Sequence, residues 1–465
     1  MNAPTIWIIL PAAIGILLML TTNQRVLSLV GGGVAVILAM VAEFIPIEEV
    51  LNAGTLSIKI DSSLNILGRN LLIKPEEGAL LALIYGTAAL WFFGAEASKT
   101  AIKLVPIGFL VTALMVAAIA VEPFLFAALF IEMAVLLAIP MLTSIYKPPG
   151  KGIIRFLIYQ TLAMPFLLLS GWLLAGVEAS PGNTALAAQS ASILGIGFAF
   201  LFAIFPLYSW IPMLLEEAPP YIVGFLLWLL PTITIIFGAG FIDRYSWLRS
   251  SPQLTTTLQF AGVIMVVTGG LWAAFQRHIG RVMAYGSIAE TGLSLLALSL
   301  DLRIGISILF LLLPARALAL AVWSLSLTII KERSETMRFS SVRGMLRTSP
   351  FASAGLVIAS LSVSGFPLLA GFPARLALWD SLARVSFNTA LWMGVGIIGL
   401  FVSSFRMLAV LSMADEYAGW EMGEDWQQGI MLGLGVIGLF ILGLFPQTVQ
   451  YLLADLPGMF EHLGR

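Results

Sequence analysis

The sequence contains no cysteine and only two histidines, His278 and His462, among its 465 residues. Iron–sulfur clusters held by cysteine and thiol chemistry within this chain are therefore excluded, and few ligands remain for haem or zinc. Charged residues are also scarce, at 11% against roughly 25% in soluble domains. The net charge of -1 argues against a nucleic-acid partner. We expect no catalytic residue, no metal site and no cofactor in this chain.

Hydrophobic residues make up 59% of the sequence, and the mean hydropathy is +0.99. Apolar segments of about 20 residues, the length that spans a bilayer, recur along the chain. The first has no positive charge before it, so we interpret it as a permanent helix and not as a secretory signal. The sequence thus predicts an all-α polytopic membrane protein with about fourteen transmembrane helices. They are expected near 4–21, 27–47, 78–96, 104–121, 123–143, 153–175, 190–215, 219–241, 256–275, 281–300, 303–330, 351–385 (broken), 388–413 and 429–446.

One stretch between the second and third segments differs from the rest. TLSIKIDSSLNILGRNLLI alternates apolar and polar residues with a period of two, which predicts a β-hairpin. We expect this hairpin to cap one face of the bundle. The domain boundaries predicted for the chain are 1–101 (three helices and the hairpin), 102–241, 242–415 and 416–465.

Two apolar segments contain prolines that should break a helix. Pro206 and Pro212 lie in LGIGFAFLFAIFPLYSWIPMLLEEAPP, and Pro367 and Pro373 lie in SGFPLLAGFPARLALWD. Proline removes a backbone hydrogen bond, and unwound backbone at membrane depth is tolerated where protein or a water-filled cavity satisfies it. Such breaks point to an ion path, or else to plain kinks. Because the breaks lie about five helices apart, helices 4–8 and 9–13 are predicted to form two inverted repeats, with helices 7 and 12 broken.

Few charges lie deep inside these segments. The acids are Glu132 and Glu290, and the cations are Arg316 and Arg375. A charge at the bilayer centre costs about 2.5–3.5 kcal/mol, so such groups usually face the bundle interior and often mark ion paths. Arginine stays charged and cannot release a proton, so proton transfer would fall to the glutamates. Glu216, just after the first break, is a candidate entry group. The alternative is a set of structural ion pairs.

Lysine and arginine predict the orientation, with both termini outside. Arg406, in VSSFRMLAV, is set apart from the deep cations, because its long side chain could reach an interface. The inward loops receive Arg25, Lys99, Lys103, Lys147, Lys151, Arg155, Arg277, Arg281 and the basic segment 331–347, and the outward loops receive Lys59, Arg69, Lys74, Arg244, Arg249 and Arg303.

Several motifs together resemble one family. FPLYSWIP followed by EEAPP resembles the PLHxWLPDAHxxAPT signature of the antiporter-like membrane subunits of respiratory complex I, which are related to Mrp sodium/proton antiporters and to membrane subunits of energy-converting hydrogenases. FIEMAVLLAIPML is similar to WExMSLxSYLL, and QRHIGRVMAYGSIAETGLSLLAL to QxDLKRLLAYSSIxHxGY. LLPARALALAVW is similar to HAxFKALLF, and SGFPLLAGFPARL to GxPPLxGFxGKF. The resemblance covers about 100–450 and implies fourteen helices, two inverted repeats and broken helices 7 and 12.

The chain departs from this family at its titratable groups. Where the family has a lysine in helix 7 and a histidine and lysine in helix 8, this chain has Leu201, Leu227 and Ile233. The helix 10 histidine falls on Glu290, and the lysines of helices 11 and 12 fall on Arg316 and Arg375. The family's glutamate in helix 5 is kept, as Glu132.

The resemblance implies an antiporter-like subunit of a complex I-like or hydrogenase-like assembly that takes part in redox-coupled proton translocation, with the electron chemistry in other subunits. A non-conducting structural subunit and a Mrp-type cation/proton antiporter are the alternatives. The expected partners are membrane and peripheral subunits of such a complex, the lipid bilayer, and protons or Na⁺. The expected location is the cytoplasmic membrane of a prokaryote, with a thylakoid membrane as an alternative.

Overall fold

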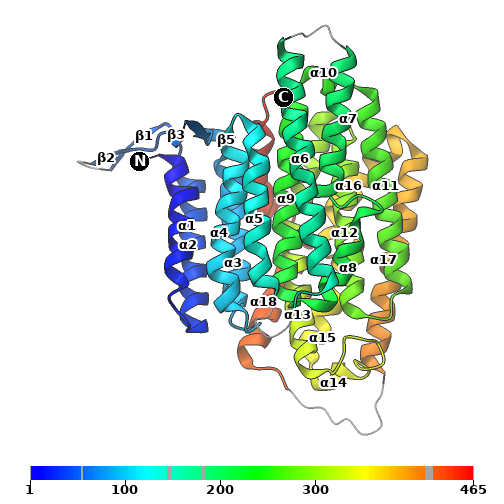
Figure 1. Cartoon of the computed structure of the whole chain (residues 1–465). Coiled ribbons are helices and arrows are strands. Elements are labelled where there is room, and N and C mark those ends of the chain that lie inside the picture. The colour runs from blue at the N-terminus through cyan, green and yellow to red at the C-terminus, as the bar shows by residue number, and fades with distance from the viewer. Residues whose placement is uncertain are drawn as a thin grey trace.

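The computed structural model describes residues 2–53, 56–66, 68–143, 148–179, 184–413 and 423–463. It is a bundle of long helices that run across one slab-like layer, with short strands on one face (Figure 1). The chain starts at the strand-bearing face, and its last described residues return to that face (Figure 1). The predicted all-α membrane class is confirmed.

The helices follow the predicted apolar segments closely. The N-terminal part contains η1 (Thr5–Ile9), α1 (Leu10–Leu18), α2 (Gln24–Phe44), η2 (Pro75–Glu77) and α3 (Gly78–Gly94). The middle part contains α4 (Ala101–Ala120), η3 (Phe124–Phe126), α5 (Ala127–Leu142), α6 (Lys151–Ala179), α7 (Thr184–Leu201), η4 (Leu207–Ser209), α8 (Trp210–Glu217), α9 (Pro220–Arg244) and α10 (Ser246–Arg249). The remainder contains α11 (Pro252–Phe275), α12 (Ile279–Leu298), α13 (Leu302–Arg333), α14 (Met345–Thr348), α15 (Pro350–Ser364), α16 (Gly371–Val385), α17 (Phe387–Ser412), α18 (Trp426–Leu444), α19 (Gln447–Ala454) and η5 (Leu456–Met459).

Eleven helical segments of the described chain are long and apolar enough to cross a membrane. The helix at Thr5–Leu18 and α15 are apolar but shorter, and α12 carries many small and polar residues. Helices are present at all the predicted places. The count of fourteen crossings, the in-plane two-fold relation of the repeats and the domain boundaries remain predictions.

The period-two stretch forms two antiparallel hairpins. β1 (Val50–Ala53) pairs with β2 (Leu56–Lys59), with Val50 opposite Lys59. β3 (Ser63–Ile66) pairs with β4 (Arg69–Leu72), and β4 also pairs with β5 (Val121–Glu122). The second sheet rests on the helices, because β4 contacts α4 and β5 leads directly into the α4–α5 connection. The first hairpin projects sideways beyond α1 (Figure 1), so the expected cap is partial.

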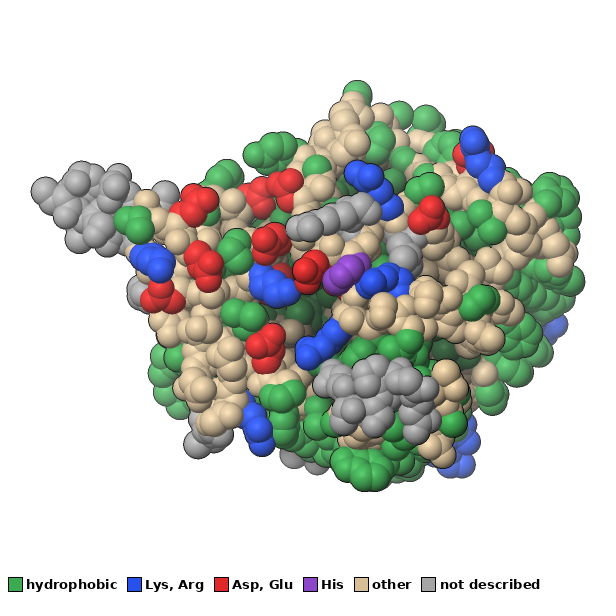
Figure 2. All heavy atoms as spheres, turned by 90° about the horizontal axis from the view of Figure 1, so that it is seen from above, with side chains coloured by type: hydrophobic (Ala, Val, Ile, Leu, Met, Phe, Trp, Pro, Cys, Tyr) green, Lys and Arg blue, Asp and Glu red, His purple; other side chains and the backbone are tan. Residues whose placement is uncertain are grey.

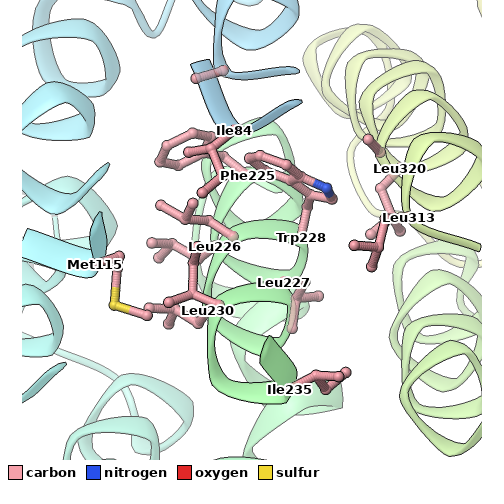
Figure 3. Packing of buried hydrophobic residues seen from close by; sticks show 14 of the residues in the cluster. Ile84, Met115, Phe225, Leu226, Leu227, Trp228, Leu230, Ile235, Leu313 and Leu320 are labelled. Atoms are coloured by element: carbon pink, nitrogen blue, oxygen red, sulfur yellow. The ribbon is translucent and has the colours of Figure 1, made fainter. Parts of the chain in front are cut away.

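The core of the bundle is built around α9. In the apolar stretch of α9 (Pro220–Arg244), 89% of the residues are buried, a larger share than in any other candidate membrane span of the described chain. Figure 3 shows Phe225, Leu226 and Leu230 of α9 on the side of Ile84 and Met115, while Trp228 and Leu227 lie toward Leu313 and Leu320 of α13. A helix that is apolar all round lies in a protein core or in lipid, and the contacts of α9 with α3, α4 and α13 place it in the core. α9 therefore joins the N-terminal helices to α13.

The strand-bearing face and the opposite face carry different charges. Figure 2 views the strand-bearing face, where acidic and basic side chains and a histidine gather in the middle. There Asp243, at the end of α9, accepts hydrogen bonds from the backbone N–H groups of Glu461, His462 and Leu463 at 2.7–2.9 Å. The basic segment 331–347 lies at the opposite face, which α14 marks in Figure 1. This is the face that the lysine and arginine distribution predicts to be inward; Lys147 lies outside the described residues.

Candidate functional site

The first broken helix is formed by α7 and α8. α7 ends at Leu201, and residues 202–209, which contain Pro206 and the short η4, separate it from α8. Pro206 has no N–H to continue the helix, so the backbone unwinds here. Pro212 is the third residue of α8, where a missing N–H is tolerated because the first turn has no partner for it. The expected break at Pro212 is therefore absent.

The second broken helix, α15 and α16, has the same design. Pro367 lies in the gap between Ser364 and Gly371, and Pro373 is the third residue of α16. Pro373, like Pro212, therefore lies in the resumed helix and is not a break. Gly365 ends α15 with a φ of 80°, a left-handed conformation that glycine adopts readily.

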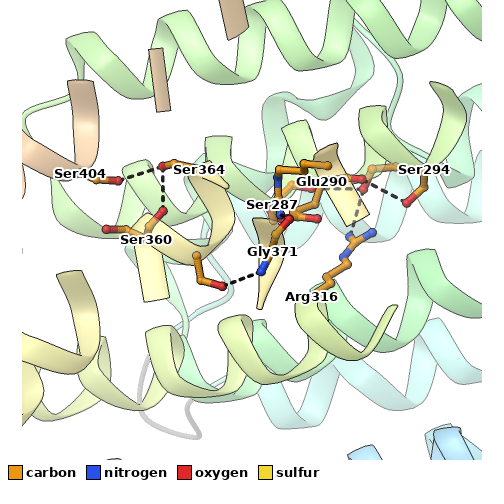
Figure 4. A network of polar contacts seen from close by, with 11 residues as sticks. Ser287, Glu290, Ser294, Arg316, Ser360, Ser364, Gly371 and Ser404 are labelled. Atoms are coloured by element: carbon orange, nitrogen blue, oxygen red, sulfur yellow. Dashed lines mark hydrogen bonds and ion pairs between the residues drawn. The ribbon is translucent and has the colours of Figure 1, made fainter. Parts of the chain in front are cut away.

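A buried ion pair lies beside the second break. The guanidinium of Arg375, on α16, pairs with the carboxylate of Glu290, on α12. The two residues are only 4% and 2% exposed. Arg375 Nη1 also donates to the carbonyl of Gly371 at 2.8 Å. Figure 4 shows Glu290 between Ser287 and Ser294 of the same helix, with Gly371 next to it.

The glycine at position 371 makes room for this pair. A side chain built there would place its Cβ 2.0 Å from the Ser362 carbonyl oxygen and 2.1 Å from Arg375 Nη1. The Gly371 backbone N–H is held by Ser362 Oγ at 3.2 Å. The start of α16 is thus fixed against α15, and that position directs Arg375 toward Glu290.

Arg316, on α13, is the second buried cation of this cluster and is 2% exposed. Its Nη2 donates to the carbonyl of Leu227 on α9 and to Thr291 Oγ1 on α12, both at 3.0 Å. Its Nε and Nη1 have no hydrogen-bond partner among the described residues. Glu290 acts on it electrostatically. The cluster of Glu290, Arg316 and Arg375 therefore contains two cations and one acid.

A small cavity separates Arg316 from the first break. Its volume is about 20 Å³, and roughly 10–15 Å³ is needed for one water molecule. Leu201 and Leu227 contribute to a largely apolar lining that also includes Gln160, Ser287, Thr291 and Arg316. Gln160 Nε2 donates to the Leu201 carbonyl at 3.5 Å. There is room here for a single water molecule, but not for a file of them.

Glu132 lies apart from this cluster. It is half-buried on α5, and its Oε1 accepts a hydrogen bond from Thr161 Oγ1 on α6 at 2.8 Å. Its buried Oε2 has no partner among the described residues. No ion pair within the described ranges includes Glu132.

Glu216 links α8 to α12 at the end of the bundle that is predicted to face inward. Its carboxylate forms an ion pair with Arg281 of α12, with distances of 2.5 Å to Nε and 3.0 Å to Nη2. The two side chains are about one-third and two-fifths exposed. His278 caps the start of α12 by accepting from the Arg281 backbone N–H at 3.3 Å. Burial lowers the pKa of His278 below its ordinary value, which agrees with a neutral ring accepting this bond.

Several polar contributors are not among the residues singled out from sequence. Glu217 accepts from the backbone N–H groups of Gly152 and Ile153 at 2.8 and 3.3 Å, and so caps α6 although the residue is exposed. Ser364 of α15 donates to Ser360 and contacts Ser404 Oγ of α17 at 3.1 Å (Figure 4). The serines in ASLSVSGFP were the feature of the sequence that could have indicated this contact. Within the described ranges, no three His, Cys, Asp or Glu side chains are grouped as metal ligands.

Comparison with known proteins agrees with this arrangement. The family model described as "NADH:quinone oxidoreductase/Mrp antiporter, TM" matches residues 152–401, more than half of the chain. The NADH-quinone oxidoreductase subunit 14 of Thermus thermophilus is 28% identical over 335 residues, which cover 68% of this chain and 73% of that protein. Subunit N of Dehalococcoides mccartyi is 26% identical over 316 residues, 63% of each chain.

Solved structures share the fold over nearly the whole chain. A chain of respiratory complex I from Thermus thermophilus superposes with a TM-score of 0.79 at 19% identity, covering 99% of this chain and 100% of that one. A chain of the Mrp complex from a Dietzia species has a TM-score of 0.79 at 16% identity, covering 99% and 97%. A chain of an archaeal membrane-bound sulfane sulfur reductase also has a TM-score of 0.79, at 18% identity, covering 98% and 97%.

Proposed function

Because the chain belongs to the NADH:quinone oxidoreductase/Mrp antiporter transmembrane family, we propose that it is an antiporter-like subunit of a complex I-like oxidoreductase and takes part in redox-coupled proton translocation. The observation that carries this proposal is the buried cluster of Glu290, Arg316 and Arg375 beside a broken helix. Electron transfer belongs to partner subunits, membrane and peripheral. The location that fits these relatives is the cytoplasmic membrane of a prokaryote.

In this proposal, Glu290 carries the proton. Arginine stays charged, so Glu290 is the one member of the cluster that can take up and release a proton. With Glu290 ionised the cluster carries one net positive charge, and with Glu290 protonated it carries two. Protonation is therefore favourable only when a nearby positive charge leaves or an anion approaches. A change of charge in a neighbouring subunit would drive that step.

We propose that α12 supplies the route from the inward face. It carries Arg281, paired with Glu216, near its first turn, and Glu290 lies about 13 Å further along its axis at 1.5 Å per residue. Tyr285 and Ser287 lie between these positions. Polar groups are scarce in the first repeat, where Leu201, Leu227 and Ile233 are buried, so we place the path in the second repeat, 242–415. The same apolar positions support the second candidate, a structural subunit that does not conduct.

Glu132 gives the first test of this function. In complexes reconstituted into vesicles, Glu132→Gln is expected to lower proton pumping only in part, because Glu132 lies in the first repeat, outside the proposed path, and can act on that path only as a carboxylate at a distance. Its carboxylate accepts from Thr161 and has one unpartnered buried oxygen. Assembly should be unaffected, since Gln keeps the bond from the threonine hydroxyl. Thr161→Val is the matched control, because it removes the hydrogen bond but keeps the titratable carboxyl. Unchanged pumping with Glu132→Gln would remove Glu132 from the proposed mechanism.

A further inference from the structure

An apolar groove lies on the outer side of the contact between α11 and α17. The two helices pack through glycine: a Cβ at Gly270 would lie 1.9 Å from the Gly396 carbonyl oxygen, and one at Gly399 would lie 2.4 Å from the Gly270 carbonyl carbon. Only small residues allow backbones to approach this closely. Beside this contact, larger side chains leave a groove of about 510 Å³.

The walls of the groove face the membrane. α11 and α17 are both long and apolar enough to span it. Leu271, Ile398 and Val402 line the groove and are 41%, 64% and 44% exposed. Phe275, 73% exposed, lies at the last turn of α11. An aliphatic chain would cover this surface better than water or a headgroup.

Positive charge gathers at one end of the groove. Arg277 follows the end of α11, and Arg406 of α17 donates to the carbonyl of Ala274, so both reach the same depth. The guanidinium carbon of Arg406 also lies 5.4 Å from the centre of the Phe339 ring. Neither arginine forms an ion pair within the described ranges, and no acid lines the groove.

We infer that this groove binds one phospholipid with an anionic headgroup. The acyl chain would lie along Leu271, Ile398 and Val402, and the phosphate would lie between Arg277 and Arg406. The arginines are at the end predicted to face inward, together with the basic segment 331–347. Basic sites at the inward ends of membrane helices attract anionic lipids, at about 1 kcal/mol per charge near the surface.

Native mass spectrometry of the delipidated complex tests this site. Phosphatidylglycerol and phosphatidylcholine with identical acyl chains are the probes. We expect one tightly retained phosphatidylglycerol per copy of this chain, and roughly 30-fold weaker retention in Arg277→Gln/Arg406→Gln, which loses two charges. The matched control is Arg384→Gln, an exposed arginine at the end of α16, which should bind as the wild type does.

A second variant tests the apolar part without touching the charges. Val402→Trp fills the groove beneath Arg406, so it should also weaken phosphatidylglycerol retention. Thermal unfolding in phosphatidylcholine checks that both variants fold. Equal retention of the two lipids, or wild-type retention in the double arginine variant, would overturn the proposal. So would a photo-crosslinker at position 398 that joins this chain to another protein subunit instead of to lipid.

Discussion

Glu290→Gln is expected to destabilise the protein by about 3–5 kcal/mol, because breaking a buried pair leaves an uncompensated charge. Here the loss leaves two buried guanidiniums, those of Arg316 and Arg375, without their acid. Arg375→Gln should cost less, since Glu290 would still face Arg316. The double variant Glu290→Gln/Arg375→Gln should recover much of the loss, because one charge then remains buried instead of two.

Thermal unfolding of the four proteins in detergent measures this cycle. Glu216→Gln is the control, since its pair with Arg281 is partly exposed and such pairs contribute less than about 1 kcal/mol. If Glu290→Gln and Glu216→Gln shifted the melting temperature equally, the cluster would not be the electrostatic centre described here. If Glu290→Gln and Arg375→Gln destabilised the protein equally, Arg316 would not interact with the carboxylate of Glu290.

The double variant Glu290→Gln/Arg375→Gln is also expected to stop the proton translocation that this subunit carries. Gln at position 290 cannot take up a proton, and the arginine that remains, Arg316, cannot release one. A positioned proton carrier contributes roughly 10²–10⁴-fold to transfer in general acid–base chemistry, so the loss should exceed that of Glu132→Gln. The measurement is proton uptake per electron pair in reconstituted vesicles.

Two controls make that measurement specific. Electron transfer measured with the membrane uncoupled should persist, because the redox chemistry is proposed to lie in partner subunits. Ser404→Ala, which removes a hydroxyl from the Ser364 contact without changing a charge, should keep proton uptake near the wild-type value. Undiminished proton uptake in the double variant would favour a structural subunit.

The sequence was sufficient to predict the broken helices and the buried charges. Proline inside an apolar segment and an ionisable residue among aliphatic ones are strong signals because each is costly in lipid. Pro206 and Pro367 lie in the two gaps as expected, and Glu290, Arg316 and Arg375 are buried. Pro212 and Pro373 could not be placed by composition, because a proline in the first turn and a proline in the break look alike in sequence.

The pairings could not be predicted. Glu290 and Arg375 are 85 positions apart, and the bond depends on how α16 starts against α15. Glu217 caps α6 through Gly152, 65 positions earlier in the chain, and no local pattern in the sequence indicates this contact. Gln160 beside Leu201 gave no signal at all, since a single amide in an apolar helix is common.

Ordered water in a high-resolution map of the assembled complex tests the central claim most directly. We predict water molecules around Glu290, Arg316 and Arg375 that continue along α12 toward Glu216 at the inward face. We predict no chain of water past Leu201, where the cavity holds about one molecule. A continuous chain that passes Leu201 and links Glu132 to either aqueous face would contradict the assignment of the path to the second repeat.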